Sequence, residues 1–153
     1  MRVVAQVVSQ SSVEIVENNF KNEIAYGLNL LVGFTHDDTK EVVEALAKKV
    51  ANLRIFMDEN EKMNLSVFDV GGEILSISQF TLYGDVKKGN RPGFSDAMDP
   101  NVASQMYDYF NECLRSYGIN VKAGEFGGDM IVAIMNIGPT TIILDSEIII
   151  KKK

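Results

Sequence analysis

A nearly continuous apolar stretch from Asn22 to Phe34 constrains the fold of this chain more than any other feature. It reads NEIAYGLNLLVGF, and its second half, Leu28–Phe34, is the longest apolar segment of the sequence. A strand that alternates apolar and polar residues buries one face, whereas a continuous apolar strand is typical of one that is buried on both faces. We therefore predict one long strand over residues 22–34 at the centre of a sheet, with Gly27 as a bulge.

Other strands are predicted around this one, wherever β-branched residues cluster or alternate. The N-terminal segment is expected to form two short strands, Arg2–Val8 and Ser12–Val16, joined around residues 9–11. A later strand, Glu73–Phe80, follows a pair of glycines that favours a turn. Three further candidates are Val121–Phe126, Met130–Met135 and Thr140–Leu144, the last two separated by a turn at Gly138-Pro139.

Two helices are predicted from capping residues and helical periodicity. Asp38 precedes an amphipathic segment in capping-box spacing with Glu41, which predicts a helix from Thr39 to about Phe56. Asp99-Pro100 begins a second helix that stops before Gly118. Its apolar stripe is Val102, Met106, Phe110, Cys113, Leu114 and Tyr117. Many strands with two helices predict an α+β fold, one domain over residues 1–153 with an antiparallel or mixed, barrel-like sheet and both helices packed on it.

Composition excludes several classes of protein. The chain has 153 residues, one cysteine and no apolar run of membrane-spanning length, so we expect a cytoplasmic protein without disulfides or a membrane partner. A net charge of -6 argues against bulk electrostatic coating of nucleic acid. A nucleic-acid partner would need a local basic patch, and the long loop predicted over residues 83–99 carries Lys87, Lys88 and Arg91. The last three residues, 151–153, are all lysine and are expected to form a frayed tail.

Metal and cofactor chemistry have no support in the sequence. With one histidine and one cysteine there is no cluster at zinc-like spacing, and no glycine-rich nucleotide motif occurs, so we expect no metal and no cofactor. His36 lies beside two aspartates before the first helix, which indicates an exposed loop residue. Cys113 falls on the apolar stripe and is interpreted as a small buried side chain.

The candidate site combines two segments in which an apolar run gives way to small or hydroxyl-bearing residues. These are Ser78–Leu82, with the sequence SQFTL, and Asn136–Thr141, with the sequence NIGPTT. Thr81 at a strand end could be a nucleophile, but no partner base is evident. The alternative is that Ser78 and Thr81 satisfy backbone groups at the strand terminus. An X-Pro dipeptide by itself indicates only a turn.

Several spaced motifs, taken together, resemble the D-aminoacyl-tRNA deacylase family along nearly the whole chain. The segments that carry the resemblance are Met1–Val4, Leu53–Phe56, Lys62–Asn64, Ser78–Leu82, Lys88–Pro92, Gly124–Met130 and Asn136–Thr141. The resemblance implies a homodimer with active sites at the subunit interface, and hydrolysis of the ester that joins a D-amino acid to tRNA, a proofreading step in translation.

The resemblance also implies roles for individual residues. Gly138-Pro139 is expected to be a cis peptide that one subunit inserts into the other's site, where its carbonyl groups exclude an L side chain. Glycine has no side chain to exclude, so glycyl-tRNA is expected to be cleaved as well. The 2′-OH of the terminal adenosine is expected to assist water attack, with backbone N–H groups near Phe80 and Thr81 stabilising the oxyanion. The expected catalytic residues are Ser78, Gln79, Phe80 and Thr81, the expected substrate-binding residues are Phe126, Met130, Gly138, Pro139 and Thr140, and the expected phosphate contacts are Lys87, Lys88 and Arg91.

The sequence departs from the family pattern at the chirality device. Val7 stands where the family usually has an arginine that helps to fix the Gly-Pro loop, and the usual Asp-Gly-Pro-Val is here residues 137–140, Ile-Gly-Pro-Thr. Two rival functions stay open. One is a non-catalytic nucleic-acid-binding or interaction protein on the same scaffold. The other is an esterase that uses Thr81 as its nucleophile and accepts substrates without RNA.

Overall fold

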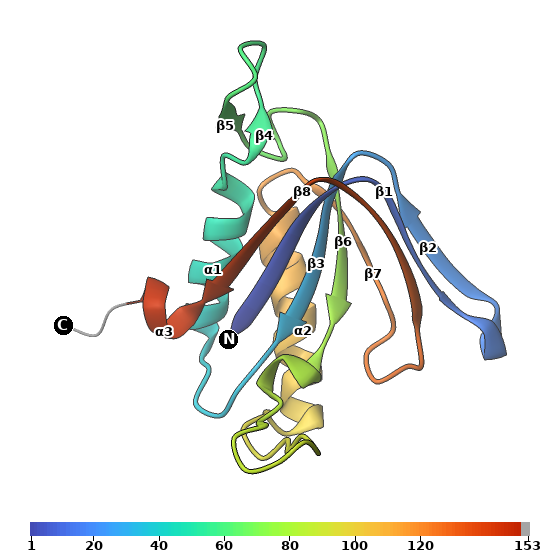
Figure 1. Cartoon of the computed structure of the whole chain (residues 1–153), viewed down its shortest axis with the longest axis vertical. Helices are drawn as coiled ribbons and strands as arrows, with labels where there is room; N and C mark the ends of the chain where they lie inside the picture. The colour runs from blue at the N-terminus through green and yellow to red at the C-terminus, as the bar shows by residue number, and fades with distance from the viewer. Residues whose placement is uncertain (151–153) are drawn as a thin grey trace.

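A computed structural model describes residues 1–150, which fold into one curled sheet with two long helices, α1 and α2, on its convex side (Figure 1). The strands of the main sheet are β1 (Arg2–Ile15), β2 (Phe20–Ile24), β3 (Gly27–Gly33), β6 (Glu73–Ser78), β7 (Asn120–Ala123) and β8 (Ile131–Asp145). A small hairpin holds β4 (Phe56–Met57) and β5 (Met63–Leu65). The helices are α1 (Lys40–Asn52), α2 (Pro100–Arg115) and α3 (Ser146–Ile149), with short 3₁₀ turns η1 (Val16–Asn18) and η2 (Phe80–Tyr83). The expected tail, 151–153, lies outside the described residues.

The main sheet is mixed, as predicted. Strand β1 pairs antiparallel with β8 on one edge and with β2 and β3 on the other. Strands β3, β6 and β7 then run parallel to one another. The sheet bends into a nearly closed, barrel-like shape, which confirms the predicted α+β class.

The first strands of the chain differ from the prediction in where they are interrupted. Residues 2–15 form one strand instead of two, because β8 pairs along its whole length. The predicted long strand 22–34 instead breaks at Ala25 and Tyr26, opposite Ser9 and Gln10 of β1. The first half of β1 therefore pairs with β3 and its second half pairs with β2, and the sheet bends between the two halves. Gly27 begins β3 instead of forming a bulge.

Strand β8 replaces the two strands that were predicted on either side of Gly138-Pro139. Residues on either side of this dipeptide pair with β1, but Val7 alone stands opposite the four residues 137–140. The chain therefore bulges out of the sheet there, with a cis Gly138–Pro139 peptide bond and a φ of 117° at Gly138. Two other predicted strands are shorter than expected, since β6 ends at Ser78 and β7 ends at Ala123.

Helix α1 is shorter than predicted, because it begins one residue later, at Lys40, and ends at Asn52. Thr39 is its cap, accepting a hydrogen bond from the Val42 N–H, whereas Asp38 accepts from the Thr35 N–H at 2.8 Å. After Asn52 the backbone leaves the helical conformation at Leu53, and Phe56 pairs with Leu65 in the small hairpin.

Helix α2 begins at Pro100 with Asp99 as its cap, as predicted, but its buried face is rotated from the expected stripe. Val102 and Tyr117 are exposed and Cys113 is half-buried. The buried residues are Ala103, Tyr107, Phe110, Asn111 and Leu114. Two of these carry polar groups, so the periodicity of apolar residues did not identify the face.

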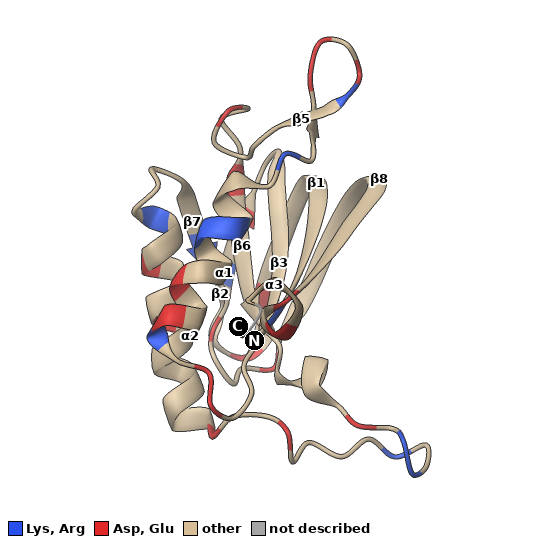
Figure 2. Ribbon diagram, turned by 90° about the vertical axis from the view of Figure 1, so that its left-hand side faces the viewer, with Lys and Arg blue, Asp and Glu red and all other residues tan. Residues whose placement is uncertain are grey.

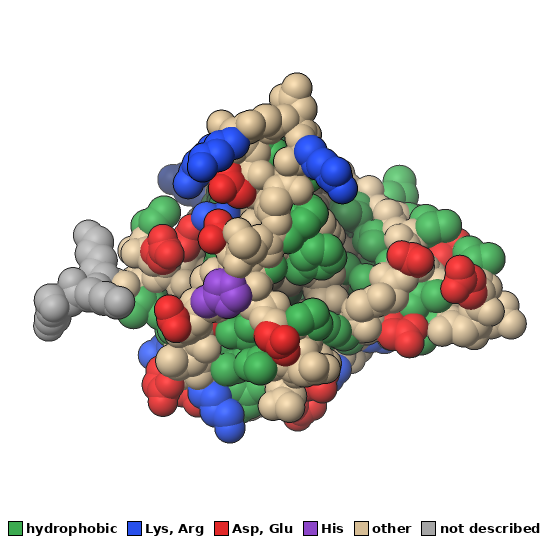
Figure 3. Space-filling view, turned by 90° about the horizontal axis from the view of Figure 1, so that it is seen from below, with side chains coloured by type: hydrophobic (Ala, Val, Ile, Leu, Met, Phe, Trp, Pro, Cys, Tyr) green, Lys and Arg blue, Asp and Glu red, His purple; other side chains and the backbone are tan. Residues whose placement is uncertain are grey.

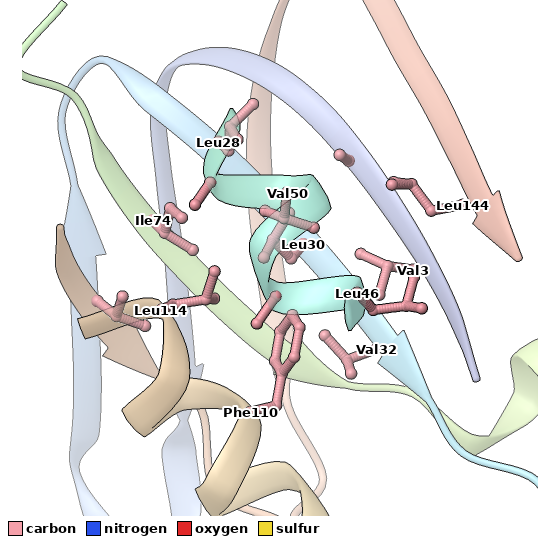
Figure 4. Packing of buried hydrophobic residues seen from close by; sticks show 14 of the residues in the cluster. Val3, Leu28, Leu30, Val32, Leu46, Val50, Ile74, Phe110, Leu114 and Leu144 are labelled. Atoms are coloured by element: carbon pink, nitrogen blue, oxygen red, sulfur yellow. The ribbon is translucent and has the colours of Figure 1, made fainter. Parts of the chain in front are cut away.

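The main core lies between the sheet and the two long helices. Figure 4 shows Phe110 and Leu114 of α2 and Leu46 and Val50 of α1 directed toward the strands. The strands contribute Val3, Leu28, Leu30, Val32, Ile74 and Leu144. A second cluster fills the concave side of the sheet and includes Val8, Val13, Ile24, Leu75 and Ile77. In residues 1–150, no helix is long and apolar enough to cross a membrane.

Candidate functional site

The candidate site is a pocket of about 770 Å³ at the end of the barrel where β3 and β6 finish. Its lining comes from segments that are far apart in the sequence: residues 32–36, 77–80, 94–103 and 126–132. Apolar side chains dominate this lining, and Figure 3 shows a hollow with hydrophobic walls beside the single histidine. Such a cavity is large enough for a nucleoside or an aminoacyl group.

Five of the predicted site residues come together in this pocket. Ser78, Gln79 and Phe80 line it from the end of β6 and the start of η2, and Phe126 and Met130 line it from the segment before β8. Strand β6 delivers the first three because its apolar residues are buried up to Ile77, after which the chain reaches solvent and turns into η2.

Thr81 is exposed and follows Phe80 in η2, and within residues 1–150 it is not among those that line the pocket. Its Oγ1 accepts a hydrogen bond from the side-chain amide of Gln79. An amide cannot take up a proton from a hydroxyl group. The arrangement therefore orients Thr81 without activating it as a nucleophile.

The 3₁₀ turn η2 is fixed at both ends. The Gln79 N–H donates to the Val32 carbonyl oxygen at 2.7 Å, which extends the pairing of β3 with β6. At the other end Arg2 donates from Nη1 to the Leu82 carbonyl oxygen at 2.9 Å. The Arg2 guanidinium also lies 4.5 Å from the centre of the Tyr83 ring and donates from Nε to Asp145 at 3.1 Å. The backbone of the candidate site is thus tied to both β1 and β8.

A buried tyrosine of helix α2 supports the pocket from the side of the helices. Tyr107 of α2 is 2% exposed, and its hydroxyl donates to the Ser76 carbonyl oxygen at 2.6 Å. Burial raises the pKa of the Tyr107 hydroxyl above its ordinary value, so the group stays neutral. Its ring packs against Phe126 with centroids 6.0 Å apart. Tyr107 therefore couples helix α2 to both β6 and the pocket wall.

Few ionisable groups line the pocket. They are His36, Asp99 and Asp129, all exposed to solvent. Asp99 accepts hydrogen bonds from the first backbone N–H groups of α2, and the His36 Nε2 atom lies 2.6 Å from the Ser95 carbonyl oxygen. Residues 1–150 thus place no ionisable side chain in hydrogen-bonding contact with Thr81 Oγ1, whose partner is the neutral side-chain amide of Gln79.

The predicted residues of the bulge in β8 do not join this pocket. Gly138 and Pro139 are exposed, Thr140 is half-buried, and all three are absent from the pocket lining formed by residues 1–150. Within one chain, the two segments predicted to form one site, residues 78–82 and 136–141, therefore do not line the same pocket.

The three predicted phosphate contacts lie at the tip of the long loop between η2 and α2. Figure 2 shows this loop projecting from the body of the molecule with basic residues at its tip. Lys87, Lys88 and Arg91 are all exposed. Paired hydrogen bonds of 2.8 and 2.9 Å between Asp85 and Gly93 close the base of the tip.

Four residues that shape the site were not predicted from the sequence: Arg2, His36, Phe94 and Tyr107. Phe94 lines the pocket and packs edge-on against Phe80, with ring centroids 5.1 Å apart. His36 was correctly predicted to be exposed, but it also lines the pocket. Each of these four residues acts through a contact with a segment that is distant in the sequence. Only Phe94 carried a signal in the sequence, because it is an apolar residue within a polar loop.

Comparisons with known proteins agree with this architecture. A family model described as D-Tyr-tRNA(Tyr) deacylase matches residues 4–145. A protein of Staphylococcus carnosus named D-aminoacyl-tRNA deacylase is 56% identical over 147 residues, which cover 96% of this chain and 97% of that protein. A protein of the same name from Bacillus thuringiensis is 52% identical, with 96% and 100% covered.

Solved structures show the same fold. The structure named c-Myc DNA Unwinding Element Binding Protein superposes with a TM-score of 0.87 and 39% identity, covering 95% of this chain and 98% of that one. A probable eukaryotic D-amino acid tRNA deacylase has a TM-score of 0.81 at 19% identity, which bears on the fold alone. From the family match and the identity to its curated relatives over nearly the full length, we conclude that the chain belongs to the D-Tyr-tRNA(Tyr) deacylase family.

Proposed function

We propose that this protein hydrolyses the ester bond of D-aminoacyl-tRNA, releasing free tRNA and the D-amino acid, and so proofreads translation. The observation that carries the proposal is that Ser78, Gln79, Phe80, Phe126 and Met130 line a single pocket. The curated relatives named D-aminoacyl-tRNA deacylase support the same activity. Because tRNA is the substrate, we place the enzyme in the cytoplasm.

The chemistry of the pocket favours a mechanism in which the substrate supplies part of the catalysis. An aminoacyl ester is already labile, and positioning it beside an attacking water can supply much of the rate. The terminal adenosine's 2′-OH would assist the water. Oxyanion stabilisation would come from the backbone N–H groups of Phe80 and Thr81, since the first N–H groups of a helical turn have no partner within the turn.

A covalent mechanism through Thr81 is less well supported. The side-chain amide of Gln79 donates to Thr81 Oγ1, so the contact that a general base would make is occupied by a group that cannot accept the proton. In the proposed mechanism Thr81 orients the substrate.

We propose that two copies of the chain assemble and complete each other's sites. Strand β8 presents a row of exposed apolar side chains to solvent, and such an edge strand is a template for pairing with another chain. These residues are Ile131, Met135, Ile137 and Ile143, which are 59%, 54%, 42% and 73% exposed. Gly138 and Pro139 lie in the same strand and outside the pocket of their own chain. A second copy can therefore supply them, with Thr140, to the pocket.

The inserted Gly138-Pro139 segment would enforce chirality. A flexible pocket distinguishes one methylene by only about 1–3 kcal/mol, whereas a backbone wall beside the substrate's α-carbon excludes an L side chain by overlap. Glycine carries no side chain to exclude, so glycyl-tRNA should also be cleaved. Resistance of glycyl-tRNA to excess enzyme would contradict this model of the wall.

The departures from the family pattern lie at this same segment. Val7 stands alone opposite the bulge of residues 137–140, at the place where an arginine would help to orient it. Val7 is buried, with 4% of its surface exposed, so it supports the bulge by packing and offers no hydrogen bond. The ratio of the cleavage rates of D- and L-aminoacyl-tRNA is therefore the most sensitive test of this part of the proposal.

The basic tip of the long loop would contact the phosphates of the RNA. Lys87, Lys88 and Arg91 are exposed together at one projecting tip, while the whole chain carries a net charge of -6. Local contacts of this kind position a nucleic acid without reading its sequence.

A second candidate function is binding of nucleic acid without cleavage. One solved structure, 39% identical to this chain, is named for binding a DNA element. A third candidate is a general esterase that acts through Thr81.

One experiment separates the three functions. Purified protein is incubated with D-Tyr-tRNA, with D-tyrosine ethyl ester and with uncharged tRNA, and both tyrosine release and complex formation are measured. The proposal expects release from D-Tyr-tRNA alone. Turnover of the ethyl ester would favour the esterase, and complex formation with no release would favour the binding protein.

A further inference from the structure

The long loop between η2 and α2 needs a specific attachment because burial does not hold it. Every residue from 86 to 96 is exposed. The loop nevertheless carries Phe94, which lines the pocket, and the basic tip. Its return limb, residues 94–98, runs beside the linker that joins β3 to α1.

Two neighbouring residues of that linker, Thr35 and His36, bind the return limb. Thr35 pairs with Ala97 in an isolated antiparallel bridge, and its Oγ1 donates to the Asp96 carbonyl oxygen at 2.5 Å. The His36 ring reaches the next carbonyl, that of Ser95, at 2.6 Å from Nε2. Thus three consecutive loop residues are held by two consecutive linker residues.

The hydrogen bond between His36 and Ser95 has only one possible donor. A carbonyl oxygen can only accept, so Nε2 must carry the hydrogen. Both the Nε2–H tautomer and the imidazolium satisfy this requirement. The ring therefore serves here as a hydrogen-bond donor through Nε2.

The attachment is transmitted to two parts of the proposed site. Ser95 follows Phe94, whose ring packs edge-on against Phe80. Phe94 follows Gly93, which pairs with Asp85 and closes the base of the basic tip. Fixing Ser95 therefore fixes both the aromatic wall and the tip.

We propose that His36 is a positioning residue, which latches the long loop through the Ser95 carbonyl and so sets Phe94 and the basic tip for the RNA end of the substrate. The proposal rests on the proposed function for its substrate, while the latch itself can be tested without any activity. Matched substitutions are available, because a glutamine amide can occupy the place of Nε2 whereas an asparagine amide reaches only the place of Nδ1. His36→Gln should keep the latch, and His36→Asn should lose it.

Limited proteolysis of the full chain tests the latch. Trypsin can cut after Lys87 and Lys88 at the tip, and after Lys62 in the turn between β4 and β5, which is also exposed and serves as an internal control. Loss of one ordinary hydrogen bond should speed cutting at the tip by about three- to tenfold in His36→Asn, with Lys62 cutting unchanged. His36→Gln should match the wild type. Equal tip cutting in all three proteins, or equal acceleration in both variants, would overturn the latch.

Steady-state kinetics test the positioning role. With D-Tyr-tRNA, His36→Asn should raise KM by about threefold or more and leave kcat within about twofold, because substrate positioning and not the reacting groups has changed. His36→Gln should restore KM. A fall in kcat with unchanged KM would overturn positioning and assign His36 a chemical role. If wild-type protein cleaves no D-Tyr-tRNA, the proposed function fails, and the same comparison is made on the Kd for uncharged tRNA; equal Kd values would then overturn the positioning role.

Discussion

Tyr107 allows a quantitative test of how the pocket is supported. Its hydroxyl, in a side chain that is 2% exposed, donates to the Ser76 carbonyl oxygen at 2.6 Å. That carbonyl also accepts from the Gly124 N–H at 3.1 Å. Tyr107→Phe therefore removes one hydrogen bond without leaving the carbonyl unpaired, and the expected loss in the free energy of unfolding is about 0.5–1.5 kcal/mol.

Truncation of the whole ring should cost much more. Tyr107→Ala also removes the packing against Phe126 and leaves a cavity, for which about 3–5 kcal/mol is typical of buried aromatic residues. Urea unfolding followed by circular dichroism gives both values, and the m-value should stay constant if only the native state is affected. A loss above about 3 kcal/mol for Tyr107→Phe would refute the reasoning, since it would mean that a buried carbonyl had lost its only partner.

The same residue gives a pH dependence with a definite sign. Burial raises the pKa of Tyr107 in the folded protein, while an unfolded tyrosine ionises near pH ~10. Its contribution to stability is therefore complete below about pH 10 and is lost as the pH rises toward the folded pKa, because the unfolded state releases the proton first. Between about pH 9 and 11 the wild type should lose stability faster than Tyr107→Phe. Parallel curves over that range would contradict the assignment.

Three further predictions concern the backbone, the mechanism and the loop. Gly27→Ala should destabilise the fold by more than about 2 kcal/mol, because a Cβ there would lie 1.8 Å from the Glu73 carbonyl oxygen. The control is Gly93→Ala, whose added Cβ would have no atom within 4 Å and should change the urea midpoint little. Equal urea midpoints for the two variants would contradict the close approach of β3 and β6. Thr81→Ala should reduce kcat by less than about tenfold, whereas a D-Tyr-tRNA ending in 2′-deoxyadenosine should lose more than about a hundredfold; the reverse order would support a Thr81 nucleophile. Lys88→Ala should weaken tRNA binding and lower the slope of log Kd against log salt concentration by about 1 at most, and an unchanged slope would remove Lys88 from the phosphate contacts.

The fold class could be predicted from the sequence because hydrophobic patterning reports which residues leave water. The break at Ala25 and Tyr26 could not, because it depends on which half of β1 each strand pairs with. The union of 131–145 into one strand was also missed, since Gly138-Pro139 reads locally as a turn while the residues on both sides pair with β1. Pairing partners are tertiary information that local propensity does not contain.

The candidate site was predictable to a similar degree. Ser78 and Gln79 could be identified because a buried strand ends there, whereas Phe126 and Met130 came from family resemblance alone. His36 and Phe94 gain their roles from hydrogen bonds and ring packing between distant segments. Such contacts leave no periodicity in the sequence.

Deacylation of D-Tyr-tRNA and L-Tyr-tRNA by the purified protein, side by side at equal enzyme concentration, tests the central proposal most directly. The account predicts cleavage of the D ester alone, with Gly138-Pro139 excluding the L side chain despite Val7 and Ile137. Cleavage of both esters would contradict the chiral wall. Cleavage of neither would contradict the enzymatic function itself.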